Sequence, residues 1–140
     1  EQAVGDQLGW AVPVYVADTD EQAKAEAGRA VETLFENFFP MPWEMLLPPG
    51  YPSMASPKNN LKLHASLGSR PRNQSADALI ESGTALIRSS ATVRRRITEM
   101  RDRTGFNIMV AKLQFGILPH DATRRNAKRF AEKVMPHFRK

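Results

Sequence analysis

The sequence contains no cysteine, no long apolar run and no leader-like N-terminus. Without cysteine there are no disulfides and no thiolate metal sites, which predicts a cytoplasmic protein. No stretch reaches the roughly 18 consecutive apolar residues of a membrane span, so we expect no membrane association. Residues 1–6 lack the basic and apolar segments of a signal peptide. The chain begins with Glu1 rather than Met, which is consistent with a processed or cut piece of a longer protein.

Histidine is also scarce, with only His64, His120 and His137 in 140 residues. None of the three stands at a ligand-like spacing from a carboxylate or from another histidine. The sequence therefore predicts no metal site, and no pair of residues is singled out as a catalytic dyad.

Charge is unevenly distributed along the chain. Residues 1–87 contain 6 Lys or Arg against 11 Asp or Glu, whereas residues 88–140 contain 14 against 4. A basic half can indicate nucleic-acid binding. No aromatic residues alternate with these arginines, as they do in a base-stacking surface, so we favour solvent-exposed helix faces and predict no nucleic-acid partner.

The most informative stretch runs from Phe106 to Phe130. It opens with an apolar run over 106–113, continues through a short loop over 114–120, and then places Asp121 where a helix N-cap is expected before an amphipathic segment. An apolar run without alternation is typical of a strand buried on both faces of a parallel sheet. In such sheets the functional groups follow the carboxyl ends of the strands, which here is the loop over 114–120.

Two further strand–helix units precede this one. Strands are predicted over 10–17 and 84–88, and helices over 18–37, over 75–82 and from an N-cap at Ser90 to Gly105. Pro13 has no N–H for a strand ladder, which predicts an edge position or a bulge for the first strand. Residues 39–73 contain seven prolines among many apolar side chains, and we interpret them as a packed insertion, either a lid over a pocket or a cover for the core.

The predicted fold is a single α/β domain over residues 1–140, with about three parallel strands. If the sheet curls toward a barrel, right-handed crossovers place all helices on its outer face. Three such strands leave two open apolar edges, which favour association with another chain.

The C-terminal third resembles the bacterial luciferase-like flavin-dependent monooxygenases. The matching segments are Ser89–Val93, Gln114–His120, Arg125–Asn126 and Phe130–Pro136, and Val14–Glu21 is similar to the sixth strand and helix of the family. The resemblance implies the C-terminal half of a (β/α)8 barrel, a partial TIM barrel with helices packed outside, in which the enzyme uses reduced FMN, or a deazaflavin, with dioxygen on a small-molecule substrate.

Five residues are candidate site residues. Ser89 and Ser90, at a predicted helix N-terminus, suit a cofactor phosphate, and plain helix capping is the alternative. Gln114, Phe115 and His120 are candidates for the substrate pocket because they follow a predicted strand.

Two functions remain open at this point. The chain is part of a flavin-dependent monooxygenase or oxidoreductase and incomplete as an enzyme by itself, or it is a catalytically silent half-barrel that self-associates through its strand edges. Its expected partner is a second copy, giving a homodimer, or the missing N-terminal half of the barrel.

Overall fold

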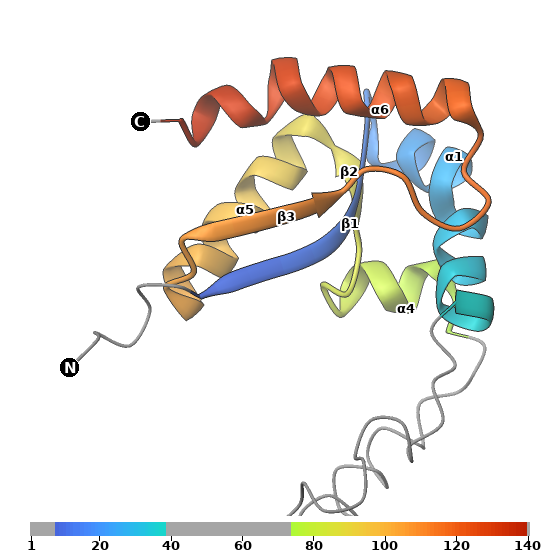
Figure 1. The fold of residues 1–140 in the computed structure, drawn as a ribbon, viewed down its shortest axis with the longest axis horizontal. Helices are drawn as coiled ribbons and strands as arrows, with labels where there is room; N and C mark the ends of the chain where they lie inside the picture. The colour runs from blue at the N-terminus through green and yellow to red at the C-terminus, as the bar shows by residue number, and fades with distance from the viewer. Residues whose placement is uncertain (1–7, 39–73, 140) are drawn as a thin grey trace, which may run out of the picture.

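Three parallel strands form one open sheet, and helices pack against it (Figure 1). The computed structural model describes residues 8–38 and 74–139, so the predicted insertion over 39–73 and His64 lie outside the described residues. The strands are β1 (Gly9–Ala17), β2 (Leu86–Ser89) and β3 (Ile108–Lys112). The predicted α/β class with three parallel strands is therefore confirmed.

Helices follow each strand, as the sequence predicts. They are α1 (Asp20–Thr33), which continues as the π-helix η1 (Leu34–Phe38), then α4 (Ala76–Glu81), α5 (Ser90–Thr104), α6 (His120–Lys133) and the short 3-10 helix η2 (Met135–His137). Among the described residues, no helix combines the length and the apolar character needed to cross a membrane.

The predicted helix ends are partly confirmed. Gly105 ends α5 in the left-handed region with φ 74°, a conformation that favours glycine. Ser75 caps α4 as predicted, whereas two other N-cap predictions are wrong by one or two residues. Ser89 rather than Ser90 caps α5, since its hydroxyl accepts from the backbone of Thr92. Pro119 rather than Asp121 precedes α6, so the carboxylate of Asp121 lies in the first helical turn, where it favours the helix dipole.

The strand order is β2-β1-β3, so β1 is the central strand, but Pro13 lies in its first half, which has no described neighbour on the β2 side. Residues 9–13 pair with β3, and residues 14–17 pair with β2. Successive residues of a strand direct their backbone groups to opposite edges. The backbone groups of Val14 face the β3 side, so those of Pro13 face the β2 side. Pairing with β2 begins only at the next residue, where Val14 pairs with Leu86. The missing N–H of Pro13 therefore costs no ladder hydrogen bond.

Helices cover both faces of the sheet, so the expectation that all lie on one face is wrong. Tyr15 and Ile87 pack with α1 and α4 in one apolar cluster, whereas Val14 and Leu86 pack with α5 and α6 in another. The physical reason is the strand order. The chain crosses from β1 to β2 in one direction and from β2 past β1 to β3 in the other, and right-handed crossovers in opposite directions place helices on opposite faces.

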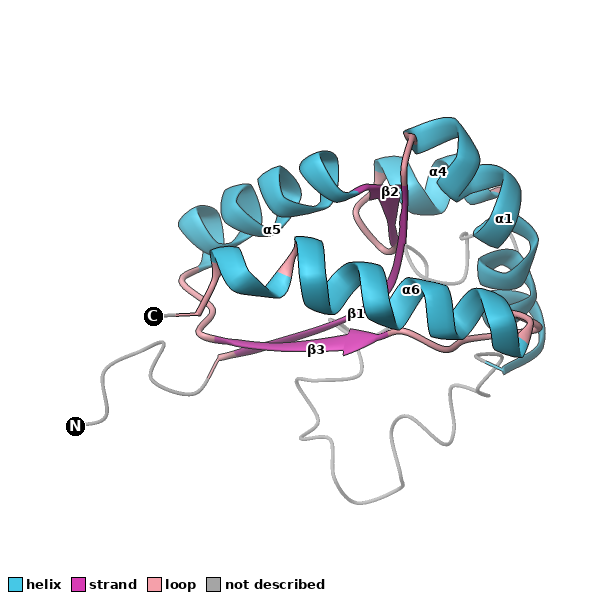
Figure 2. Ribbon diagram, turned by 90° about the horizontal axis from the view of Figure 1, so that it is seen from above, coloured by secondary structure: helices cyan, strands magenta, loops and turns pink. Residues whose placement is uncertain are grey.

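The β3 strand was expected to be buried on both faces, and this is also wrong for the described chain. Its residues Ile108 and Val110 are 50% and 52% exposed. Figure 2 shows α5 and α6 on the same side of β1 and β3. The opposite side of this half of the sheet, with Ile108 and Val110, is therefore an apolar surface that no other described residue covers.

Candidate functional site

The carboxyl ends of the strands carry a polar cluster that begins at Ser89. The backbone N–H of Ser89 donates to Asp20 Oδ1 at 2.7 Å, and the Thr92 hydroxyl donates to Asp20 Oδ2 at 3.3 Å. Asp20 is the first residue of α1. The N-terminus of α5 thus already binds a carboxylate, the kind of anion that a helix N-terminus favours.

Asp20 is held in its charged form by these contacts. Burial alone would raise the pKa of its carboxyl group, but hydrogen bonds from Ser89 and Thr92 lower it, and the net shift of the pKa is downward. The Arg88 guanidinium, 3.6 Å from Oδ2, acts in the same direction. An additional phosphate at this helix end would meet a carboxylate that is already bound there.

The three residues predicted for a substrate pocket are not brought together. Gln114 is exposed, and His120 has a side chain that is 83% exposed, next to the carboxylate of Asp121. Phe115 is 3% exposed and belongs to the core cluster formed with α1. Among the described residues, none of the three lines the pocket beside β2, the one bordered by α5, β3 and α6, or the one along the first turns of α6.

The loop that follows β3 is fixed against α1 by Gly116. Its backbone has φ 54°, and a Cβ atom at this position would lie 2.0 Å from the carbonyl oxygen of Ala30. Only glycine permits this approach. The Gln114–His120 loop is therefore anchored at its centre.

A second polar cluster at this edge was missed by the sequence analysis. The Tyr15 hydroxyl donates to Glu26, and the Gln22 side-chain amide donates to the same carboxylate at 2.7 Å. The hydrogen bond from Tyr15 lowers the pKa of Glu26. Burial, together with the neighbouring carboxylate, raises the pKa of Tyr15 to about 12. A tyrosine near the carboxyl end of a strand, with a carboxylate in the helix that follows, was the available signal.

Asn126 was matched as part of a motif, but its role came only from the structure. It is fully buried, and its side chain contacts the backbones of both β1 and the segment after β3. Nearby, Arg129 Nη2 donates to Asp18 Oδ2 at 2.7 Å, while its Nη1 atom is buried without a hydrogen-bond partner among the described residues.

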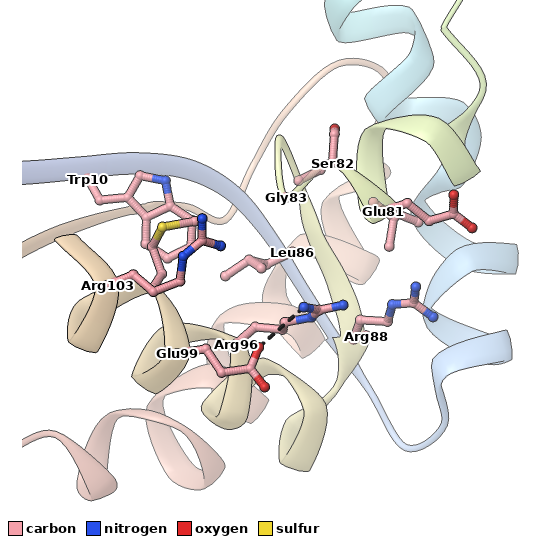
Figure 3. A pocket seen from close by; sticks show the side chains of 12 residues that line it. Trp10, Glu81, Ser82, Gly83, Leu86, Arg88, Arg96, Glu99 and Arg103 are labelled. Atoms are coloured by element: carbon pink, nitrogen blue, oxygen red, sulfur yellow. Dashed lines mark hydrogen bonds and ion pairs between the residues drawn. The ribbon is translucent and has the colours of Figure 1, made fainter.

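A small pocket lies away from this edge, beside the start of β2 (Figure 3). Its volume is about 100 Å³. It combines apolar side chains from the sheet with charged side chains from α5 and the turn before β2. Its lining includes Trp10, Glu81, Leu86, Arg88, Arg96, Glu99, Met100 and Arg103.

No group of three or more histidine, aspartate or glutamate residues suited to a metal ion occurs in the described part of the chain. The polar groups at the carboxyl edge are suited to hydrogen bonding and to holding charge. They form two separate clusters, one at Asp20 and one at Glu26.

Comparison with known proteins gives structural likeness without a sequence match. No protein-family model matches the sequence, and no curated protein matches it. The fold is similar to part of the monooxygenase RslO1 from Streptomyces bottropensis, with a TM-score of 0.59 and 18% sequence identity. The match covers 99% of this chain and 33% of that chain, so this chain spans about one third of the length of that protein. At this identity the likeness concerns the fold.

Proposed function

We propose that this chain is part of a flavin-dependent monooxygenase or related oxidoreductase of the luciferase-like type, and that it is incomplete as an enzyme by itself. The observation that carries the proposal is the likeness of nearly the whole chain to one third of a monooxygenase. The motif over 114–120 supports it, because the described loop is anchored at Gly116 just past the carboxyl end of β3, where parallel sheets carry their chemistry.

The proposed half-barrel needs further strands from outside this chain. A (β/α)8 barrel closes eight strands into a ring, whereas the described sheet has three strands in the order β2-β1-β3. Closure therefore requires another polypeptide, or another part of the natural protein, to pair with these strands. It also requires β1 to exchange one of its neighbours, since consecutive strands are adjacent in a barrel.

The residues at Ser89 and Ser90 do not fit an FMN phosphate as they stand. The Ser89 N–H is bound by the carboxylate of Asp20, and a phosphate would be repelled by it. In the proposal, a flavin phosphate is held at Ser89 and Ser90 only after Asp20 turns away, or it is held by residues outside this chain.

Gln114 and His120 remain proposed substrate contacts. Both side chains are exposed just past β3, so a small molecule at this edge can reach them. Phe115 is buried against α1, so its proposed contribution is to hold the loop beneath the substrate.

Flavin binding tests this proposal. The full protein encoded by the natural gene is titrated with oxidised FMN in air and with reduced FMN under anaerobic conditions, while flavin fluorescence is followed. We expect the full protein to bind FMN saturably, and the 140-residue chain alone to bind FMN at least tenfold more weakly. If the full protein does not bind FMN at about 100 μM FMN, well above typical micromolar ligand affinities, the proposal is contradicted.

A second candidate function is self-association without catalysis. The observation that favours it is the apolar surface with Ile108 and Val110, which no other described residue covers, because exposed apolar patches commonly mark protein interfaces. In this case the chain forms a homodimer and binds no flavin in either redox state.

A further inference from the structure

The pocket beside β2 arises from the pairing register. Residues 9–13 of β1 pair only with β3, and β2 begins to pair at Val14. No strand among the described residues therefore lies beside the first half of β1 on the β2 side. The C-terminal half of α5 and the turn at Gly83 border the space that remains.

Cationic groups outnumber anionic groups around this space. The lining contains Arg88, Arg96 and Arg103 but only two carboxylates, Glu81 and Glu99. Figure 3 shows Arg103 on the Trp10 side of Leu86, and Arg96 and Arg88 on its other side. Three guanidinium groups around one hollow repel one another, and an anion between them relieves that repulsion.

The ion pairs leave one arginine available. Arg88 pairs with Asp20 at 3.6 Å, and Arg96 pairs with Glu99 at 3.2 Å. Glu99 is already shared, since Arg95 lies 3.7 Å from its other oxygen. Arg103 has no ion-pair partner in the part of the chain that the structure describes. A guanidinium of this kind suits bidentate binding of a carboxylate.

The remaining walls are apolar. Leu86 is 3% exposed, and Ile80, Met100 and the partly buried ring of Trp10 stand beside it. The volume of about 100 Å³ is smaller than the roughly 150 Å³ of a protein cavity that holds benzene. A ligand of a few heavy atoms fits this space, whereas a nucleotide does not.

We propose that this pocket binds a small aliphatic monocarboxylate, with its alkyl chain against Leu86 and its carboxylate on Arg103. The pocket lies at the amino end of β2, whereas the proposed chemistry lies past the carboxyl ends of the strands. The site is therefore an accessory one, and it does not depend on the proposed flavin function.

Trp10 provides a direct readout of binding. The chain has two tryptophans, Trp10 and Trp43, so a Trp43→Phe background leaves Trp10 as the only indole. Butyrate is titrated into this protein, and Trp10 fluorescence is followed. Butylammonium, which has nearly the same shape and the opposite charge, and inorganic phosphate are titrated in parallel at equal ionic strength.

We expect a saturable change with butyrate and at least tenfold weaker responses to butylammonium and phosphate. Arg103→Ala weakens butyrate binding about tenfold or more, because it removes the charged hydrogen-bond donor that holds the carboxylate. Arg95→Ala is the matched control, since Arg95 lies on the same helix and pairs with the same Glu99 but does not line the pocket. It should change affinity less than twofold.

Other outcomes overturn the proposal. No saturable response to butyrate up to about 100 mM rejects the site, because even small ligands reach millimolar affinity in a matched pocket. Phosphate binding as tight as butyrate binding shows a general anion site instead. An equal loss in Arg95→Ala and Arg103→Ala shows that only the overall charge of α5 matters. Circular dichroism of each variant confirms that it is folded before the titrations are compared.

Discussion

The side-chain carbonyl of Asn126 accepts a hydrogen bond from the backbone N–H of Val16 at 2.9 Å. The amide nitrogen of the same side chain donates to Val14 O at 2.8 Å and to Leu113 O at 2.9 Å. Pairing between β1 and β3 stops at Pro13 and Lys112. Asn126 therefore takes the place of the next residue of β3 and satisfies the backbone of β1 where its neighbouring strand has ended.

Replacement of Asn126 by leucine should strongly destabilise the fold. Leucine has a similar size but leaves the Val16 N–H and two carbonyl oxygens without partners in a buried site, which costs at least about 3 kcal/mol in the free energy of unfolding. Urea unfolding measures this loss. Thr123→Val is the control, since it removes an exposed hydroxyl contact from the same helix and should cost less than about 1 kcal/mol. A similar small loss in both variants would show that Asn126 is not essential to the strand junction.

Gly116→Ala should destabilise the protein more than alanine at other glycines with positive φ. At position 116 an alanine would have an unfavourable left-handed backbone and its Cβ would also clash with Ala30. Gly83 and Gly105 have φ 76° and 74°, but a Cβ there would lie in open space. Alanine at Gly83 or Gly105 costs about 1 kcal/mol for the backbone alone. We expect more than twice that loss for Gly116→Ala in thermal or urea unfolding. Equal losses at the three positions would mean that the β3–α6 loop moves away from α1 without cost.

Stability should fall in acid partly through Asp20. The pKa of its carboxyl group is lowered in the folded state from an ordinary value of 3.8. The carboxylate therefore contributes stability above pH 3.8, and this contribution is lost as the pH falls through the lower pKa of the folded state. Asp20→Asn should flatten the decrease in unfolding free energy between pH 5 and pH 3 (about one unit either side of that ordinary value). Parallel curves for the two proteins would exclude Asp20 as a source of the acid dependence.

Stability should also fall in strong alkali through Tyr15. Its pKa is raised from 10.0 to about 12 in the folded state. The unfolded chain thus loses the phenolic proton first, so the contribution of Tyr15 is complete below pH 10 and is lost as the pH rises toward 12. Tyr15→Phe should be less stable than the parent at pH 7 by about 1 kcal/mol, and its unfolding free energy should depend less on pH above 10. An unchanged alkaline slope in this variant would contradict the assignment.

Val110→Lys should weaken self-association if the uncovered surface of β1 and β3 is an interface. A lysine ammonium there makes burial of the apolar face costly. Light scattering should show a dimer for the parent and the monomer mass of 15.7 kDa for the variant at the same concentration. Ala131→Lys, at an exposed position of α6, should leave the dimer unchanged. A parent protein that is already monomeric would reject this interface and the second candidate function.

The local pattern of residues was sufficient to predict the type of most elements. The apolar, β-branched runs before Asp18 and after Gly105 form strands, and the spacing of apolar residues after each of them gives helices, as observed. These features depend on interactions within a few residues, such as side-chain periodicity and the φ value of Gly105. The choice between Ser89 and Ser90 as a cap was not decided in this way, because the two side chains are identical.

Only the tertiary structure decided how these elements are arranged. The central position of β1, helices on both faces and the exposure of Ile108 and Val110 follow from which strands pair, and pairing joins residues up to 99 positions apart, as in Gly9 with Ile108. The same holds for the candidate sites. Asp20 meets Ser89, Tyr15 meets Glu26 and Asn126 meets Val16 through contacts between separate elements. Sequence periodicity determined the type of most elements, because helix and strand formation depend on near neighbours, whereas the partners of each element and the burial of its faces were determined by the packing of the whole domain.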